Sequence, residues 1–97
     1  MAGVRLTPRA KEDLKLIGRY TTKRWGKEQR NRYLKDLDKR FSWLAENPLL
    51  GKHRSDVAKR YYSFPQGEHV VFYLISKDYI DIIGIPHKKM DIVAYFE

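Results

Sequence analysis

The segment Tyr79–Asp91, with the sequence Tyr-Ile-Asp-Ile-Ile-Gly-Ile-Pro-His-Lys-Lys-Met-Asp, decides the fold that this chain predicts. Its first seven residues are mainly apolar and rich in Ile, which favours a buried strand. We expect the strand to end at Pro86, because proline has no N–H to donate to a strand ladder. His87 and two lysines follow, so the strand delivers a basic tip. That tip serves either catalysis or binding, and the two alternatives imply different functions.

Two further strands precede this one in the sequence. Arg60–Phe64 and His69–Ser76 are rich in Val, Tyr and Phe, and Pro65-Gln66-Gly67 separates them. A second turn-forming pair, Lys77-Asp78, leads into Tyr79–Ile85. Short β-rich runs joined by such turns are typical of hairpins, so we expect three consecutive antiparallel strands.

The N-terminal half predicts two helices. Thr7-Pro8 is typical of a helix start, since the Thr hydroxyl can cap a free N–H and Pro fits the first turn. Gly26 should end the first helix, and Lys27–Asn47 should form the second, because a residue before proline avoids helical geometry. The short break between them predicts an antiparallel hairpin. Apolar residues recur every three or four positions, and the core should include Leu14, Ile17, Leu37 and Phe41.

The sheet needs cover on two faces. Its two later strands carry apolar residues on both faces, whereas an antiparallel sheet with one solvated face would alternate apolar and polar residues. One helical hairpin can cover only one face. The other face requires the C-terminal segment Met90–Phe96 (expected as a short helix or coil), a second copy of the chain, or a partner. Val4–Thr7 is expected at an edge of the sheet.

The composition limits the classes of function. Ninety-seven residues suffice for a single domain, residues 1–97. There is no Cys, which excludes disulfides, thiolate metal sites and a Cys nucleophile. The N-terminus lacks a signal-like apolar run and no apolar stretch approaches ~18 residues, so we expect a cytoplasmic protein. No phosphate-binding Gly loop, metal-spaced cluster or nucleophile elbow is present, so we expect no cofactor and no metal.

The net charge of +8 is concentrated in the first half of the chain. Residues 1–48 contain thirteen Lys or Arg against six Asp or Glu, whereas residues 49–97 contain seven against six. A basic half on a small domain favours an anionic partner: nucleic acid, an acidic protein segment or an anionic membrane face. The alternative is a solvated helical surface that only keeps the protein soluble.

One constellation of residues has catalytic potential. Arg60, His69 and His87 come from different strands and could converge at one sheet edge. Cleavage of RNA by its own 2′-hydroxyl needs a base, an acid and a cation for the phosphate, and these residue types suit those roles. The alternative is that both histidines are held by local hydrogen bonds at strand ends. His53, in the loop Leu49–Lys59, is expected to be solvated.

A series of motifs extends along nearly the whole chain. They are Leu6-Thr7-Pro8-Arg9-Ala10-Lys11-Glu12-Asp13-Leu14, Ile17 with Tyr20-Thr21, Trp25-Gly26-Lys27-Glu28-Gln29, Tyr33, Asn47-Pro48 with Gly51, Arg60, His69-Val70-Val71-Phe72-Tyr73 and Ile85-Pro86-His87-Lys88-Lys89-Met90-Asp91. Their order and spacing resemble the ParE branch of the RelE/ParE superfamily, the toxin halves of bacterial toxin–antitoxin pairs. In this family the last strand is usually followed by an apolar residue, Leu and His. This chain has Pro86 in place of that Leu, so we expect a different turn after the strand.

The resemblance implies an α+β fold in which an N-terminal helical hairpin packs on a small twisted antiparallel β-sheet. It also implies a ParD-type antitoxin whose flexible C-terminal segment wraps the toxin and covers apolar surface. ParE-like toxins inhibit DNA gyrase, trapping it with cleaved DNA and blocking replication, so gyrase and the DNA within its complex are the implied targets. The RelE branch instead cuts messenger RNA on the ribosome.

The Trp-Gly turn and the scarcity of Lys and Arg on the sheet favour a gyrase inhibitor that is not an enzyme. A RelE-like ribosome-dependent endoribonuclease using Arg60, His69 and His87 is the alternative, and a non-toxic binding module is a second. For target binding we predict Arg60, His87, Lys88, Lys89 and Asp91. For antitoxin binding we predict Arg19, Trp25, Tyr33, Trp43, Val71, Tyr73 and Ile83.

Overall fold

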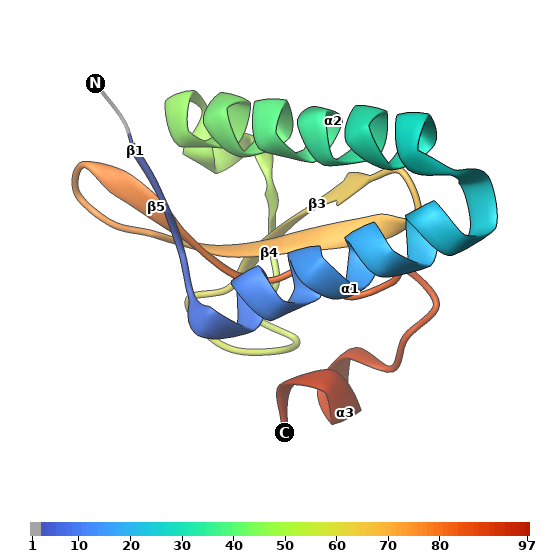
Figure 1. The fold of residues 1–97 in the computed structure, drawn as a ribbon. Helices are drawn as coiled ribbons and strands as arrows, with labels where there is room; N and C mark the ends of the chain where they lie inside the picture. Colours follow the sequence, from blue (N-terminus) through green and yellow to red (C-terminus); the bar gives the residue numbers. More distant parts are fainter. Residues whose placement is uncertain (1–2) are drawn as a thin grey trace.

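Two long antiparallel helices lie against one face of a five-stranded sheet (Figure 1). The computed structural model describes residues 3–97. In chain order its elements are β1 (Gly3–Leu6), α1 (Pro8–Trp25), α2 (Lys27–Glu46), the 3₁₀ turn η1 (Pro48–Leu50), β2 (Lys52–His53), β3 (Tyr62–Gln66), β4 (His69–Ile75), β5 (Tyr79–Gly84) and α3 (Ile92–Phe96). The α+β class and the helical hairpin predicted from the sequence are confirmed. None of the helices in residues 3–97 is both long and apolar enough to cross a bilayer.

The sheet is mixed rather than antiparallel. Its strand order is β1-β5-β4-β3-β2, and the three strands β3, β4 and β5 are antiparallel as predicted. β1, however, pairs in parallel with β5, from Gly3 opposite Tyr79 to Leu6 opposite Ile82. The expectation of an all-antiparallel sheet is therefore wrong at this edge. The direction of β1 depends on how the chain returns through the helical hairpin, which local sequence does not specify.

The β3–β4 turn is tighter than the sequence predicted. Pro65 lies within β3 opposite Val70, and the turn consists of Gly67 and Glu68. β2 pairs only with the first two residues of β3, so at Pro65 the outer side of β3 is a free edge. A proline without an N–H is tolerated there. The segment expected as a loop also supplies the short strand β2.

The start of α1 is fixed to the sheet by one side chain. Thr7 Oγ1 accepts a hydrogen bond from the Ala10 N–H at 3.2 Å and donates to the Ile82 carbonyl at 3.0 Å. The cap predicted at Thr7 thus also joins α1 to β5. The hydrophobic core lies between the helices and the sheet. Its buried members are Ala10, Ile17, Leu37, Phe41, Leu44, Ala45, Val71, Tyr73, Ile80, Ile82 and Ile85. Leu14, which the sequence placed in the core, is half-buried and packs against its border.

The second face of the sheet is partly covered by the C-terminal segment. Phe72 points away from the helices and is fully buried, with the Phe96 ring 5.0 Å from its own and the Arg54 guanidinium 5.2 Å from its centroid. Phe96 is the last residue of the short helix α3, which lies at the C-terminal end of the chain (Figure 1). The sequence allowed the C-terminal segment, a second copy of the chain or a partner to cover this face. The C-terminal segment covers part of it.

α3 is attached to α1 as well as to the sheet. The Tyr95 hydroxyl donates to the Asp13 carboxylate, and the same carboxylate oxygen accepts the Ile85 N–H at 2.8 Å. Burial, followed by the hydrogen bond to Asp13, raises the pKa of Tyr95. Glycine is required at position 84 for a steric reason, because a Cβ there would collide with the Tyr95 ring. One carboxylate thus connects α1, the exit of β5 and α3.

Candidate functional site

His69 and His87 meet where β4 begins and the chain leaves β5. The Val70 N–H donates to the Pro86 carbonyl at 2.9 Å, and the Lys88 N–H donates to the Glu68 carbonyl at 2.9 Å. These bonds set His69 and His87 opposite one another in an antiparallel bridge, with ring centroids 5.4 Å apart. β5 ends at Gly84, and Pro86 continues the contact with β4 through its carbonyl, since it has no N–H to donate.

Tyr33 brings α2 to the same place. Its hydroxyl oxygen lies 2.6 Å from His69 Nδ1 and 3.1 Å from the Gln66 carbonyl oxygen, and it accepts the Glu68 N–H at 3.0 Å. Its ring fills the space beside Gly67, which has φ 58°, and a Cβ there would lie 2.6 Å from Tyr33 Cε1. Gly67 therefore meets two requirements: a left-handed turn conformation and close approach of the Tyr33 ring.

His69 is held in its neutral form. Burial, followed by the proximity of His87, lowers its pKa to about 4, against smaller opposing effects of the Glu68 and Asp13 carboxylates. A histidine with this pKa is a weak proton acceptor near pH 7, where a general base works best with a pKa close to the ambient pH. The Tyr33 hydroxyl and His69 therefore form a structural contact between α2 and β4.

Glu68 lies between the side chains of Lys88 and His87, next to the contact between Tyr33 and His69. Its carboxylate is 3.0 Å from Lys88 Nζ and 4.0 Å from His87 Nε2. The hydrogen bond from Lys88 is the main cause that lowers the pKa of Glu68. His87 Nδ1 accepts the Lys89 N–H at 3.1 Å, so the backbone orients the imidazole. The tip of the β5 exit is thus a local network of charges and hydrogen bonds.

Arg60 does not join the histidines. It precedes β3, whose ladder with β4 runs from Tyr62 opposite Tyr73 to Gln66 opposite His69. Four residues of strand separate the two ends, about 13 Å at ~3.3 Å per residue. The predicted convergence of Arg60, His69 and His87 at one edge is therefore wrong. Register, which was not known from sequence, puts Arg60 at the far end of the ladder.

A groove runs beside the two histidines along the flank of α1. We call it the histidine groove. One part has a volume of about 330 Å³ and an adjoining part about 300 Å³, and the two share Tyr20, His69 and His87. Large apolar side chains stand at its border with high exposed fractions: Leu16 51%, Tyr20 58%, Trp25 66% and Met90 48%. We call these four residues the apolar rim.

Three members of the apolar rim were missed by sequence reasoning. The periodicity of α1 allowed either Tyr20 or Thr21 on the buried face, and the structure buries Thr21 and exposes Tyr20. Leu16 lies one position from the buried Ile17, and Met90 follows the last strand. A one-residue difference in helical phase separates the core stripe from the rim, and a spacing of three or four residues does not resolve it.

The residues predicted to bind an antitoxin differ widely in exposure. Arg19 and Trp25 are exposed on α1, and Tyr33 lines the histidine groove. Trp43 is half-buried, with its ring 5.1 Å from Phe64, and Ile83 is also half-buried.

Val71 and Tyr73 are buried completely between the sheet and the helices. The Tyr73 hydroxyl donates to the Pro48 carbonyl at 2.6 Å and accepts the Gly51 N–H at 3.1 Å. Both residues are core, and their prediction as contact residues is wrong. The strand is apolar on both sides, so the sequence did not indicate which side faces the helices.

The residues predicted to bind the target lie in two places. His87, Lys88, Lys89 and Asp91 follow β5 at the histidine groove, and the three after His87 are exposed. Asp91 also caps α3, because its Oδ1 accepts the N–H groups of Val93 at 3.0 Å and Ala94 at 3.3 Å. Arg60 is exposed on the loop before β3, away from the other four.

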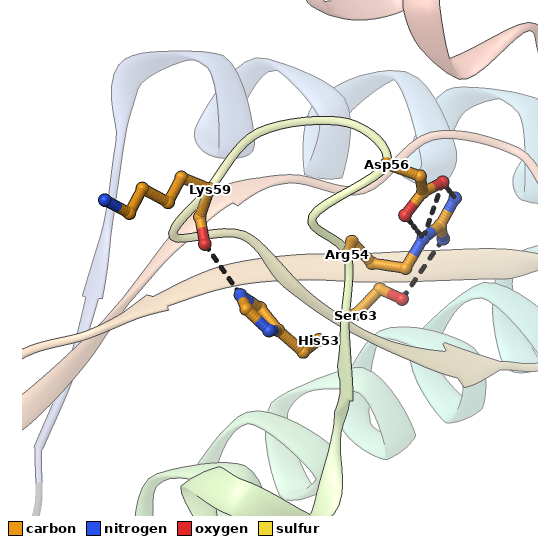
Figure 2. A network of polar contacts seen from close by, with 5 residues as sticks. All are labelled: His53, Arg54, Asp56, Lys59 and Ser63. Atoms are coloured by element: carbon orange, nitrogen blue, oxygen red, sulfur yellow. Dashed lines mark hydrogen bonds and ion pairs between the residues drawn. The ribbon is translucent and has the colours of Figure 1, made fainter.

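Figure 2 shows a network that sequence reasoning missed in that loop. Arg54 binds the Asp56 carboxylate through Nε at 3.0 Å and Ser63 Oγ through Nη1 at 3.2 Å. The hydrogen bond from Arg54 lowers the pKa of Asp56. His53 Nε2 lies 2.6 Å from the Lys59 carbonyl oxygen, so this histidine is exposed but fixed rather than simply solvated. The network shapes the loop that carries Arg60.

The chain is similar to known toxins over nearly its whole length. Residues 4–92 match the family model described as the ParE toxin of the type II toxin–antitoxin system parDE. A curated protein named Toxin ParE1 from Caulobacter vibrioides is 35% identical over 95 residues, covering 98% of each chain. Toxin ParE1 from Mycobacterium tuberculosis is 31% identical over 88 residues, covering 90% of each.

Two solved structures share the fold. A chain from the structure titled "Chromosomal ParDE TA system from P. aeruginosa" superimposes with a TM-score of 0.75 at 17% identity, covering 90% of this chain and 96% of that one. A chain of the YoeB dimer from Staphylococcus aureus superimposes with a TM-score of 0.63 at 20% identity, covering 89% and 95%. The match over residues 4–92 and the 35% identity to the Caulobacter Toxin ParE1 show that the chain belongs to the ParE toxin family of type II toxin–antitoxin systems.

Proposed function

We propose that this toxin inhibits DNA gyrase and blocks replication, and that a ParD-type antitoxin neutralises it by covering the apolar rim. The single observation that carries the proposed antitoxin contact is the exposure of Leu16, Tyr20, Trp25 and Met90 along one groove, and gyrase inhibition is proposed from the family. Soluble proteins rarely leave large apolar side chains gathered on one surface unless a partner binds there. The family supports a toxin, and the rim supports a partner that buries it.

The chemistry of the rim indicates what kind of antitoxin segment fits. Trp25 and Tyr20 offer broad aromatic surfaces, which are common anchors of binding energy at interfaces. Arg24 lies with Cζ 5.9 Å from the Trp25 centroid, and Lys88 Nζ lies 3.0 Å from Glu68, which lines the same part of the groove. A segment with apolar side chains flanked by Asp or Glu would satisfy both features. We therefore propose an acidic and apolar antitoxin segment.

Action on gyrase is proposed to occur by contact rather than by catalysis. His87, Lys88, Lys89 and Asp91 project from the exit of β5, and Arg60 offers a second, separate point of contact. Arg60 and the histidine groove are far apart, so a single partner must be large to contact both. Gyrase acts on DNA in the cytoplasm, so we place the toxin there.

A supercoiled plasmid incubated with gyrase, ATP and the toxin tests this proposal. We expect linear DNA to accumulate with the wild type and to decrease with K88Q/K89Q. The control is K35Q/K39Q, which removes two positive charges from α2 and should leave the linear product unchanged. Full gyrase activity in the presence of wild-type toxin would contradict the proposal.

A ribosome-dependent endoribonuclease is the second candidate, favoured by the contact between His69 and His87. The low pKa of His69, about 4, and the separation of Arg60 weigh against it. Messenger RNA bound to ribosomes should therefore stay intact with the toxin present. If neither the plasmid nor the messenger RNA changes, the remaining alternative is a binding module without toxicity.

A further inference from the structure

The outer side of the helical hairpin carries a regular row of positive charges. Lys11, Lys15, Arg19 and Lys23 recur every four residues along α1, and all four are exposed. At ~1.5 Å of rise per residue the row extends over about 18 Å. Among residues 3–97, none of the four takes part in an ion pair. We call Lys15, Arg19, Lys23 and the neighbouring Arg30 of α2 the cationic groove.

α2 completes this groove instead of neutralising it. Lys15, Arg19 and Lys23 line one wall of a groove of about 760 Å³, and Arg30 and Asn31 line the other. Arg30 Nε and Nη2 donate to Asn31 Oδ1 at 3.1 and 3.0 Å, which fixes the guanidinium. Within the described chain the lining contains no Asp or Glu. Glu12 is the carboxylate beside the start of the row, one turn before the groove.

The two helices approach closely at this point, which makes the groove shallow and continuous. Gly18 lies at its centre, and a Cβ there would touch Leu34 at 3.6 Å and Arg30 at 3.8 Å. Leu14 and Leu34 form the floor, but both are half-buried and pack against the core. Of the apolar rim, Tyr20 and Trp25 adjoin the Lys23 end of the groove, where they line a separate hollow of about 650 Å³ with Lys23 and Arg24. Along Lys15 and Arg19 the described lining of the groove thus offers charge without a large, highly exposed apolar side chain.

We propose that the cationic groove binds the sugar–phosphate backbone of duplex DNA. A polyanion with evenly spaced charges matches a regular row of cations that have no ion-pair partner within residues 3–97. An amphipathic acidic peptide would need an apolar anchor, and the described lining of the groove contains no large, highly exposed apolar side chain. A membrane surface would need the same anchors around the cations. Phosphate contact carries no base recognition, so binding is independent of sequence.

This DNA binding stands apart from gyrase inhibition. It requires only the toxin and the duplex, and it places a DNA-binding surface in the groove between α1 and α2, which adjoins the apolar rim at Lys23. A toxin bound to gyrase through the β5 exit would have this surface free for the DNA that gyrase holds. The failure of either property leaves the other measurable.

Fluorescence anisotropy with a short labelled DNA duplex tests the inference. Each phosphate contact contributes ~0.9 to the slope of log affinity against log salt concentration. The variant K15Q/R19Q/K23Q should therefore flatten the slope by about 2.7 and weaken binding roughly tenfold or more at low salt. The control K52Q/K59Q/K77Q loses the same charge from β2 and two surface loops and should bind like the wild type. Circular dichroism and thermal melting establish that both variants are folded.

Three results would overturn the inference. Equal loss in both variants would mean that net charge, and not the groove, attracts DNA. Undetectable binding of the wild type at low salt would remove DNA as the occupant. If polyglutamate or vesicles containing anionic lipid bind the groove in a K15Q/R19Q/K23Q-sensitive manner while the duplex does not, the occupant is an acidic protein segment or a membrane instead.

Discussion

The hydroxyl oxygen of Tyr33 lies 2.6 Å from Nδ1 of His69, joining α2 to the first residue of β4. The same hydroxyl accepts the Glu68 N–H and lies within hydrogen-bond distance of the Gln66 carbonyl, so one side chain holds the β3–β4 turn against the helical hairpin. The β3–β4 turn also positions Glu68 beside Lys88 and His87. The histidine groove therefore depends on a tyrosine that lies far from it in sequence.

Replacing Tyr33 by Phe should destabilise the protein. The substitution keeps the ring beside Gly67 but leaves the Glu68 N–H and His69 Nδ1 without their partner. Loss of a partly buried hydrogen-bonding partner costs ~1–3 kcal/mol. Urea denaturation should show this decrease for Y33F, whereas Y20F, at an exposed tyrosine, should unfold like the wild type. Equal stability of Y33F and Y20F would mean that the hydroxyl contributes nothing.

The depressed pKa of His69 predicts loss of stability in acid. Its pKa is about 4 in the folded state against a reference value of 6.5. Between these values the unfolded chain binds a proton that the folded protein does not, so stability falls as pH drops from 6.5 towards 4. The carboxylates of Glu68 and Asp13 nearby moderate the effect without reversing it.

We expect H69Q to have a flatter dependence of unfolding free energy on pH than the wild type between pH 6.5 and 5. Urea denaturation at a series of pH values measures this difference. H53Q is the matched control, because His53 is exposed and lies outside the cluster. Parallel curves for H69Q and the wild type would show that burial of His69 does not influence its titration.

Gly84→Ala should displace α3. A Cβ at Gly84 would collide with the Tyr95 ring, so the hydroxyl of Tyr95 could not keep its hydrogen bond to Asp13. Hydrogen exchange of the α3 amides should become faster in G84A. G3A is the control, since a Cβ at Gly3 would meet Tyr79 Cβ at an ordinary 3.7 Å. Unchanged exchange in G84A would show that the strand can shift to accommodate the methyl group.

Trp25→Ala should weaken antitoxin binding. An aromatic anchor at the centre of an interface often contributes ~2 kcal/mol or more, which corresponds to roughly thirtyfold in affinity. Titration calorimetry with a purified ParD-type antitoxin measures the change. L49A tests specificity, because Leu49 is 75% exposed but lies outside the apolar rim. Similar affinities for W25A and the wild type would place the antitoxin elsewhere.

Sequence reasoning located the elements whose signals are local. The cap at Thr7, the break at Gly26 and the stop before Pro48 fixed both helices, because each is a property of a few neighbouring residues. Features that depend on register were missed. The parallel pairing of β1 with β5 and the distance of Arg60 from His69 follow from which residues face each other across strands, and no local pattern contains that information.

The candidate surface was predicted only in part for a related reason. Trp25 was identified, but Val71 and Tyr73 were placed on a surface because their strand is apolar on both sides. Tyr20 could not be separated from Thr21, since both fit the spacing of the buried stripe. Whether an apolar residue belongs to a core or to an interface depends on what covers it, and that becomes visible only in three dimensions.

The central claim is that the toxin acts on gyrase by contact and uses no catalytic histidine. Plasmid linearisation by gyrase and ATP should therefore be as extensive with H69Q as with the wild type, at a pH and temperature where circular dichroism shows both to be folded. The account would be contradicted if folded H69Q were inactive, or if the wild type left gyrase unaffected and cut ribosome-bound messenger RNA.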